Sequence, residues 1–221
     1  MGFAAFLEDL PLLHTWDLGK TWNTGGFQAW QLKRMHELLT ERFSEPVRVL
    51  ETGAGNSTIT FLQVPNLEQL VTIAPSAELR DRILGYCEAH GIGTDAMEYR
   101  LERSEIALPS IAFGAGGQSP PDPGPHFDAV LIDGGHGWPT VFVDFCYANL
   151  MMRKGSLLFL DDTQLYSVAE ISRLLELQPG FTLREELAKL QIWEKDDNQA
   201  FLPEHSREPY IIEQTRIAAS S

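Results

Sequence analysis

Three aspartates follow two apolar segments of the chain, at the points where those segments end. Asp133 follows the run 127–132, and Asp161 and Asp162 follow the run 156–160. If the two runs are neighbouring strands of a parallel sheet, the three carboxylates meet at one edge of it. Carboxylates packed together repel one another unless a cation or protons intervene, and oxygen ligands of this kind suit Mg²⁺. The spacing therefore predicts a divalent-cation site made of Asp133, Asp161 and Asp162.

His136 stands three residues after Asp133, in a turn rich in glycine. A histidine titrates near neutral pH and can take a proton from a hydroxyl, and a metal that binds the hydroxyl lowers its pKa. The turn thus places beside the predicted cation a histidine that can take a proton. Two other interpretations stay open: His136 could be a turn residue bonded to the backbone, and one aspartate of the 161–162 pair could cap a helix. We expect the remaining histidines, which show no ligand spacing, to be solvated: His14, His36, His90, His126 and His205.

A turn that contains two glycines follows the short apolar run 47–50. Gly53 and Gly55 let a ligand approach the backbone with no Cβ in the way, and Glu51 can accept hydrogen bonds from an ammonium group or a hydroxyl. A dinucleotide site would need a third glycine where Thr58 stands, and an acid at the end of the next strand, where the chain reads Ile-Ala-Pro-Ser. NAD is therefore disfavoured. The alternative is that the two glycines only shape a tight turn.

Short apolar runs alternate with helical patterns along most of the chain. We expect strands at 47–50, 69–73, 97–101, 127–132, 156–160, 181–187, 190–194 and 210–214, and helices at 30–43, 76–90, 105–111, 138–152 and 167–177. This alternation predicts a doubly wound α/β fold with a mostly parallel sheet. We expect residues 1–25 to be an N-terminal extension that acts as a lid, and residues 26–221 to form a single domain. The Gly- and Pro-rich segment 114–125 is predicted to be an inserted loop.

Three motifs together resemble the class I S-adenosylmethionine-dependent methyltransferases. Segment 49–58, Val-Leu-Glu-Thr-Gly-Ala-Gly-Asn-Ser-Thr, is similar to the first motif of that family, and segments 127–136 and 154–162 are similar to its fourth and fifth strands. Ile-Asp-Gly-Gly-His at 132–136 is most similar to an I-D-G-x-H branch that includes metal-dependent O-methyltransferases. The resemblance covers about residues 45–165. It implies a Rossmann-like, seven-stranded sheet.

The resemblance also implies a binding site for S-adenosylmethionine. The family usually carries an acid after its second strand to hold the ribose, and this chain has Ala74 there, so Ser76 or Glu78 would substitute. The implied contacts are Glu51 at the amino group, Gly53, Ala54, Gly55 and Ser57 at the methionine and ribose end, Ser76 at the ribose, Ser104 and Glu105 at the adenine edge, and Asp133.

For the acidic cluster, the resemblance implies that Asp133, Asp161 and Asp162 are metal ligands, and that His136 and Asp133 are catalytic. The predicted activity is methyl transfer from S-adenosylmethionine to an oxygen of a small-molecule acceptor, assisted by Mg²⁺ or another divalent cation. Two alternatives remain open. One is methyl transfer without a metal, and the other is a catalytically silent domain that binds a cofactor or a partner.

The net charge of the chain favours some classes of binding partner over others. Its 221 residues include 17 Lys and Arg against 31 Asp and Glu, a net charge of −14, and such a surface repels phosphate backbones and anionic lipids. Nucleic acid and membranes are therefore disfavoured. Cys87 and Cys146 are expected to be buried thiols, and no basic residue precedes the apolar N-terminal stretch, so we expect a cytoplasmic protein. N-terminal aromatic residues favour a homodimer: Phe3, Phe6, Trp16 and Trp22.

Overall fold

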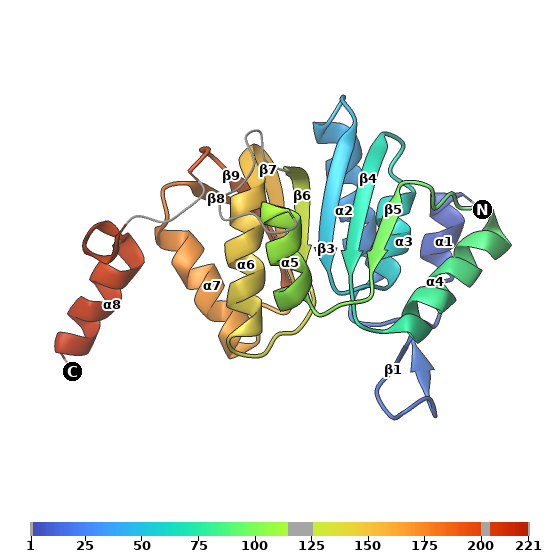
Figure 1. Ribbon diagram of the computed structural model, residues 1–221, viewed down its shortest axis with the longest axis horizontal. Coiled ribbons are helices and arrows are strands. Elements are labelled where there is room, and N and C mark those ends of the chain that lie inside the picture. Colours follow the sequence, from blue (N-terminus) through green and yellow to red (C-terminus); the bar gives the residue numbers. More distant parts are fainter. Residues whose placement is uncertain (1, 115–125, 200–203, 221) are drawn as a thin grey trace. The chain divides into compact units, whose positions relative to one another are not determined.

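Strands and helices alternate along the chain, as the apolar runs predict (Figure 1). The computed structural model describes residues 2–114, 126–199 and 204–220. The chain divides into two units, Met1–Ala107 and Leu108–Ser221.

The first unit is built on three parallel strands in the spatial order β5-β4-β3. They are β3 (Val47–Thr52), β4 (Leu67–Ile73) and β5 (Met97–Arg100). Thr72 pairs with Glu51 on one side and with Tyr99 on the other, so the carboxyl ends of the three strands lie together.

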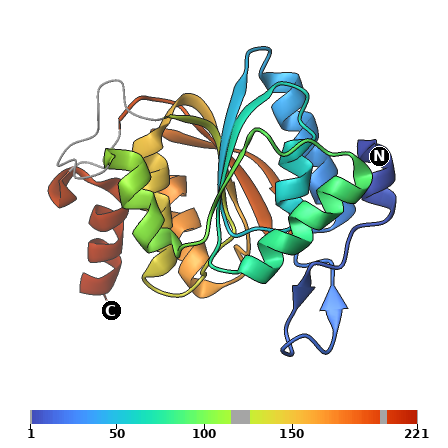
Figure 2. The same ribbon diagram turned by 45° about the vertical axis from the view of Figure 1, so that its right-hand side comes forward.

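Helices of the first unit pack beside one another and beside these strands. They are α1 (Phe3–Glu8), α2 (Ala29–Arg42), α3 (Asn56–Leu62) and α4 (Ala77–His90). Helix α1 packs against α2, and α2 packs against α3 (Figure 2). Between α1 and α2, two short antiparallel strands, β1 (His14–Thr15) and β2 (Trp22–Asn23), form a hairpin that the sequence did not predict.

The second unit contains four strands in the order β6-β7-β9-β8. Strands β6 (Phe127–Ile132) and β7 (Met152–Leu160) are parallel, and β9 (Leu190–Lys195) is antiparallel to both β7 and β8 (Phe181–Leu187). Its helices are α6 (Thr140–Met151), α7 (Tyr166–Leu177) and α8 (Pro209–Ala219), with a short 3₁₀ helix at His205–Arg207. Helix α5 (Ser104–Phe113) spans the division between the units.

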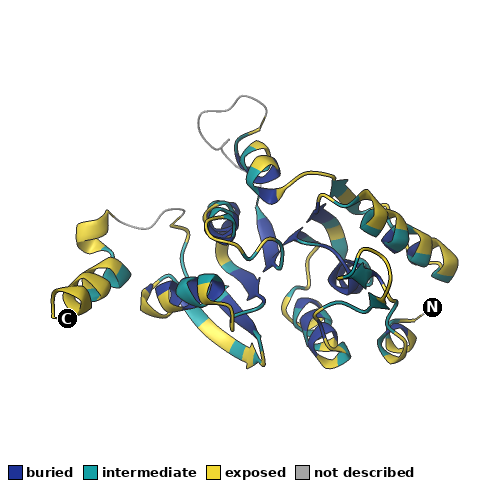
Figure 3. Ribbon diagram, turned by 90° about the horizontal axis from the view of Figure 1, so that it is seen from below, coloured by how far each residue is buried: buried dark blue, intermediate teal, exposed yellow. Residues whose placement is uncertain are grey.

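Burial explains why these segments are strands. Every residue of β6 is buried, and so are residues 156–160 of β7, as expected of strands that are covered on both faces. The edge strand β8 instead contains only intermediate and exposed residues after its first position. Figure 3 shows this contrast by colour, with buried strand residues in dark blue and exposed residues in yellow.

Most of the predicted elements are confirmed, with ends that differ by a few residues. The predicted strand at 210–214 is wrong, because these residues belong to helix α8. Its paired isoleucines favour a strand, but Pro209 in the first turn and the Glu-Gln-Thr-Arg-Ile-Ala-Ala sequence that follows favour a helix. Cys146 is exposed rather than buried, whereas Cys87 is buried. The predicted loop falls mainly on residues 115–125, which lie outside the described residues.

Three strands of the first unit and four of the second confirm a mostly parallel, seven-stranded sheet. Among the described residues, no helix is both long enough and apolar enough to span a membrane.

Candidate active site

The ends of β6 and β7 bring the predicted aspartates together within the second unit. Ile132 pairs with Leu160 in the parallel register, and the Asp161 amide donates a hydrogen bond to the Ile132 carbonyl at 3.1 Å. Asp133 and Asp161 therefore leave the sheet at the same edge. Asp162 follows in a left-handed backbone conformation, with φ +59°.

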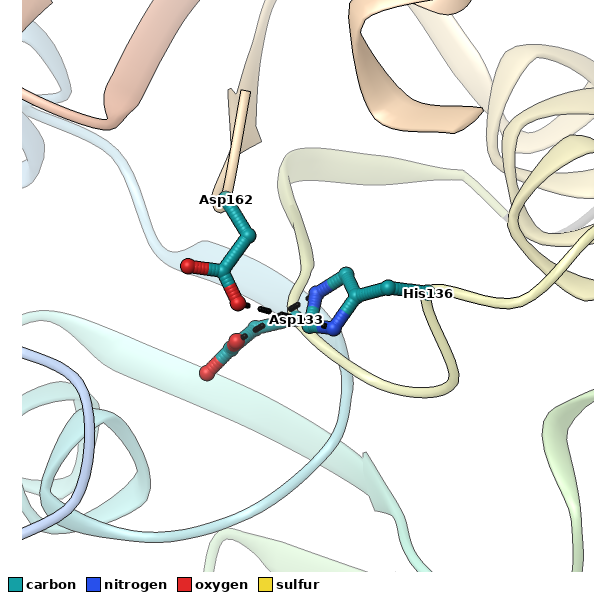
Figure 4. Close-up of side chains that lie close together, drawn as sticks. All are labelled: Asp133, His136 and Asp162. Atoms are coloured by element: carbon teal, nitrogen blue, oxygen red, sulfur yellow. Dashed lines mark ion pairs between the residues drawn. The ribbon is translucent and has the colours of Figure 1, made fainter. Parts of the chain in front are cut away.

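His136 lies between two of these carboxylates (Figure 4). Its Nδ1 is 3.5 Å from Asp162 Oδ2, and its Nε2 is 3.8 Å from Asp133 Oδ1. The Ser167 hydroxyl donates to the His136 carbonyl and so ties the turn to the start of α7. The buried Nε2 has no hydrogen-bond partner among the described residues. This nitrogen is therefore available to a ligand or a proton.

Lys189, which the sequence analysis did not single out, also enters the cluster. Its Nζ lies 2.7 Å from Asp161 Oδ2 and 2.5 Å from Asp162 Oδ1. The lysine comes from the turn that joins β8 to β9. No local pattern marks it, because only the antiparallel pairing of β9 with β7 brings this turn to the strand ends.

The pKa shifts show how the cluster balances its charge. Burial raises the pKa of Asp133 well above its usual range, and the negative charge of Asp161 raises it further. Burial also raises the pKa of Asp161, although Lys189 opposes this. Burial acts in the same direction on Asp162, but hydrogen bonds from Lys189 and Gln164 outweigh it and lower the pKa of Asp162. The ammonium group of Lys189 thus offsets part of the negative charge of the cluster, and burial favours the neutral form of Asp133.

The side chains that could hold a cation differ from the predicted set. Asp133, His136 and Asp162 each offer one ligand atom, all within 4.8 Å of one another. Asp161 is instead 1% exposed and paired with Lys189. A donor set of two carboxylates and an imidazole fits a divalent cation, and it is less selective for Mg²⁺ than three carboxylates would be.

In the first unit, the turn after β3 has the conformation that the glycines predict. Gly53 has φ +92°, which a residue with a Cβ rarely adopts, and its amide donates to the Ile73 carbonyl at 2.9 Å. Two buried side-chain oxygens beside the turn, Thr52 Oγ1 and Asn56 Oδ1, have no hydrogen-bond partner among the described residues. Unpaired buried polar atoms are costly, so these positions fit a polar ligand. The sequence analysis did not single out either residue.

Glu51 is completely buried at the end of β3, and its carboxyl group already has partners. Ser57 Oγ donates to it at 3.0 Å and Thr72 Oγ1 at 2.8 Å, and the Thr58 hydroxyl is a further donor. Burial raises the pKa of Glu51 to about 7, although the three hydroxyls act in the opposite direction. The predicted contacts Glu51 and Ser57 therefore bind each other.

His14, expected in solvent, packs against the glycine turn instead. A Cβ built on Gly55 would lie 2.5 Å from its Nε2, and one on Gly25 would lie 2.6 Å from its Cδ2. The Asn56 side chain fastens the same N-terminal segment by donating to the carbonyls of Pro11 and Thr24. Gly55 is thus needed to accommodate His14, a role that sequence spacing does not reveal.

The other predicted cofactor contacts have local partners. Ser76 caps α4, where its Oγ accepts a hydrogen bond from the Leu79 amide at 3.2 Å. Glu78 is exposed and pairs with Arg82. Ser104 is 8% exposed, and its side chain is a hydrogen-bond partner of Glu105. Glu105 pairs with Arg103 through a 2.7 Å hydrogen bond.

Two aromatic residues follow the aspartate-bearing ends of β6 and β7. Trp138 is 66% exposed and Tyr166 is 74% exposed. Exposed aromatic rings near a polar cluster can supply flat contact surfaces for a ligand.

Comparison with solved structures places this fold in a known class. The O-methyltransferase TomG from Streptomyces achromogenes, in complex with SAM, matches at 20% identity with a TM-score of 0.61, over 77% of this chain and 82% of that one. Cofactor-bound Rv0187 from MTB matches at 18% identity with a TM-score of 0.61, over 89% of this chain and 88% of that one. A ribosomal RNA methylase from Streptococcus thermophilus matches at 15% identity with a TM-score of 0.55, over 74% of this chain and 95% of that one. No protein-family model and no curated protein sequence matches this chain.

The chain therefore has the fold of the class I S-adenosylmethionine-dependent methyltransferases, as its motifs predict. O-methyltransferases are among the structures that share this fold with it.

Proposed function

We propose that this protein transfers a methyl group from S-adenosylmethionine to an oxygen of a small-molecule acceptor, with the help of a divalent cation. The observation that carries the proposal is the cluster of Asp133, His136 and Asp162 at the strand ends of a class I methyltransferase fold. The net charge of −14 favours a small molecule over RNA as the acceptor.

S-adenosylmethionine would bind at the turn after β3. Gly53 has the backbone conformation that such a turn needs, and the unpaired oxygens of Thr52 and Asn56 are suited to its polar groups. We retain Glu51, Ala54, Gly55, Ser57, Ser76, Ser104, Glu105 and Asp133 as proposed contacts. When bound, the cofactor would supply a methyl group activated for in-line attack.

His136 is the proposed general base. Asp162 Oδ2 faces its Nδ1, whereas Nε2 makes no hydrogen bond within the described residues, so Nε2 is the nitrogen that would accept the proton of the acceptor hydroxyl. The acceptor oxygen would then form the bond to the methyl carbon, and the sulfur would keep the electron pair of the bond that breaks. A divalent cation held by the carboxylates of Asp133 and Asp162 would lower the pKa of the acceptor hydroxyl, and the imidazole of His136 would stay free to take the proton.

Methyl transfer without a metal is the second candidate, and Lys189 favours it. The ammonium group already neutralises part of the cluster, as a cation would. Turnover in EDTA separates the two: full retention of activity would remove the cation from the mechanism, whereas loss that Mg²⁺ or Mn²⁺ restores supports it.

Calorimetry with S-adenosylhomocysteine tests the cofactor site directly. We expect binding in the micromolar range, and no heat at millimolar ligand would instead favour a catalytically silent domain. A cytoplasmic location, a homodimer and the choice of Mg²⁺ as the cation remain proposals that rest on the sequence.

A further inference from the structure

The turn between β8 and β9 is fixed where it presents Lys189. Ala188 has a left-handed backbone conformation, with φ +58°. The Lys189 carbonyl accepts hydrogen bonds from both the amide and the hydroxyl of Thr163, at 3.0 and 2.9 Å. Since Thr163 directly follows the aspartate pair, these bonds attach the backbone of the lysine to the acids that its side chain contacts.

The ion pairs of Lys189 are partly buried, unlike the surface pairs of this chain. The side chains of Lys189, Asp161 and Asp162 are 24%, 1% and 20% exposed. Water screens such contacts less than it screens exposed ones, and removing one partner leaves a buried charge without compensation.

The lysine also determines which oxygens of the cluster are free. Asp162 Oδ1 accepts from Lys189 and, at 3.0 Å, from Gln164 Nε2, whereas Oδ2 faces His136. Asp161 Oδ2 accepts from Lys189, and the buried Oδ1 receives no N–H or hydroxyl donor from the described residues. Asp161 is thereby oriented toward Lys189.

We propose that Lys189 is a positioning residue that acts as the built-in counter-ion of this cluster and keeps Asp161 and one oxygen of Asp162 away from a bound metal. The cluster is then stable without a metal and binds a divalent cation weakly, through Asp133 and Asp162 Oδ2, while His136 stays free to act as the base. The inference rests on the cation site of the proposed function, but its test needs no methyl transfer.

Mn²⁺ titration followed by electron paramagnetic resonance tests the role of Lys189, with thermal unfolding measured in EDTA. We expect Lys189→Met to bind Mn²⁺ at least tenfold more tightly than the unchanged protein, because it frees two carboxylate oxygens and removes a positive charge. Its melting temperature in EDTA should fall by several degrees and recover with Mn²⁺. Lys189→Arg should resemble the unchanged protein. The exposed Lys154→Met, which changes the net charge equally, should alter neither property.

Asp161→Asn tests the same inference without removing the lysine. We expect its Mn²⁺ affinity to stay within threefold, because Asp161 is not a ligand. Loss of more than tenfold would make Asp161 a ligand and overturn the inference, as would a Lys189→Met protein that binds Mn²⁺ no more tightly. If neither the unchanged protein nor Lys189→Met binds Mn²⁺, both the cation site and this inference fail, while calorimetry with S-adenosylhomocysteine still tests the cofactor site.

Discussion

Each unit buries acidic side chains at the carboxyl ends of its strands, but the two units compensate them differently. Glu51 in the first unit is surrounded by hydroxyl donors, and burial still raises its pKa to about 7. Asp162 in the second unit is bonded to the ammonium group of Lys189, and its pKa is lowered despite burial. Asp161 shares the same ammonium group but is more deeply buried, and its pKa stays raised. A neighbouring cation therefore offsets the lost hydration of a carboxylate only where burial is partial.

The comparison also assigns different tasks to the two regions. The turn after β3 has a fixed backbone and unpaired polar atoms suited to holding a ligand, whereas the cluster at β6 and β7 holds groups that can exchange protons or bind a cation. Substitutions in the turn after β3 should therefore leave cation binding at the acidic cluster unchanged, and substitutions in the cluster should leave cofactor affinity unchanged.

The largest expected effect is on catalysis. His136→Asn should lower the turnover number by about 10²-fold or more, because the acceptor hydroxyl loses its general base. The affinity for S-adenosylhomocysteine, measured by calorimetry, should stay within threefold. Turnover within a few fold of the unchanged enzyme would show that another group accepts the proton.

Glu51→Gln should change how stability depends on pH. The folded protein favours the neutral carboxyl group, so the stabilisation is complete below pH 4.5, the ordinary pKa, and is lost as pH rises through about 7. The raised pKa corresponds to about 3 kcal/mol. The free energy of unfolding, measured with urea at both pH values, should fall between pH 4.5 and pH 8. In the variant this fall should be about 3 kcal/mol smaller than in the unchanged protein.

The exposed Glu45→Gln is the matched control for this measurement, and it should keep the pH dependence of the unchanged protein. If Glu51→Gln also keeps it, Glu51 is ionised in the folded state and the contrast between the two regions fails.

Gly55→Ala should destabilise the first unit by about 1–3 kcal/mol, because the new methyl group would collide with the His14 ring. His14→Ala in the same protein should recover the part of the loss that the collision causes, while the backbone strain of a Cβ at φ +159° remains. A double-mutant cycle of urea unfolding would measure the recovered part. Gly93→Ala is the control, since a Cβ there meets nothing within 4 Å. Additive effects of the two substitutions would contradict the contact.

Gly53→Ala should weaken S-adenosylhomocysteine binding about tenfold, because a Cβ at φ +92° costs roughly 1–2 kcal/mol and distorts the turn. Calorimetry measures the affinity, and Mn²⁺ binding at the acidic cluster should not change. An unaltered affinity would place the cofactor elsewhere.

The sequence predicted that Asp133 and Asp161 lie close together, because this proximity follows from the pattern of the two strands that precede them. Two mainly apolar runs form parallel strands, and parallel strands end at the same edge of a sheet. The same argument predicted most of the strands and helices, because burial on one or two faces leaves a periodic pattern in the chain. It failed at 210–214, where a pair of isoleucines lies in a helix that exposes much of its surface.

The sequence by itself thus determined the order of strands and helices, the class of fold, and the strand ends at which acids and glycines would stand. Only the tertiary structure decided that Lys189 neutralises Asp161 and Asp162, that His136 rather than Asp161 faces the other two carboxylates, and that His14 packs on Gly55. The periodic pattern of apolar residues can be read directly from the sequence, whereas ion pairs and steric contacts depend on distance through space. Residues far apart in sequence come within that distance only when the strands pair.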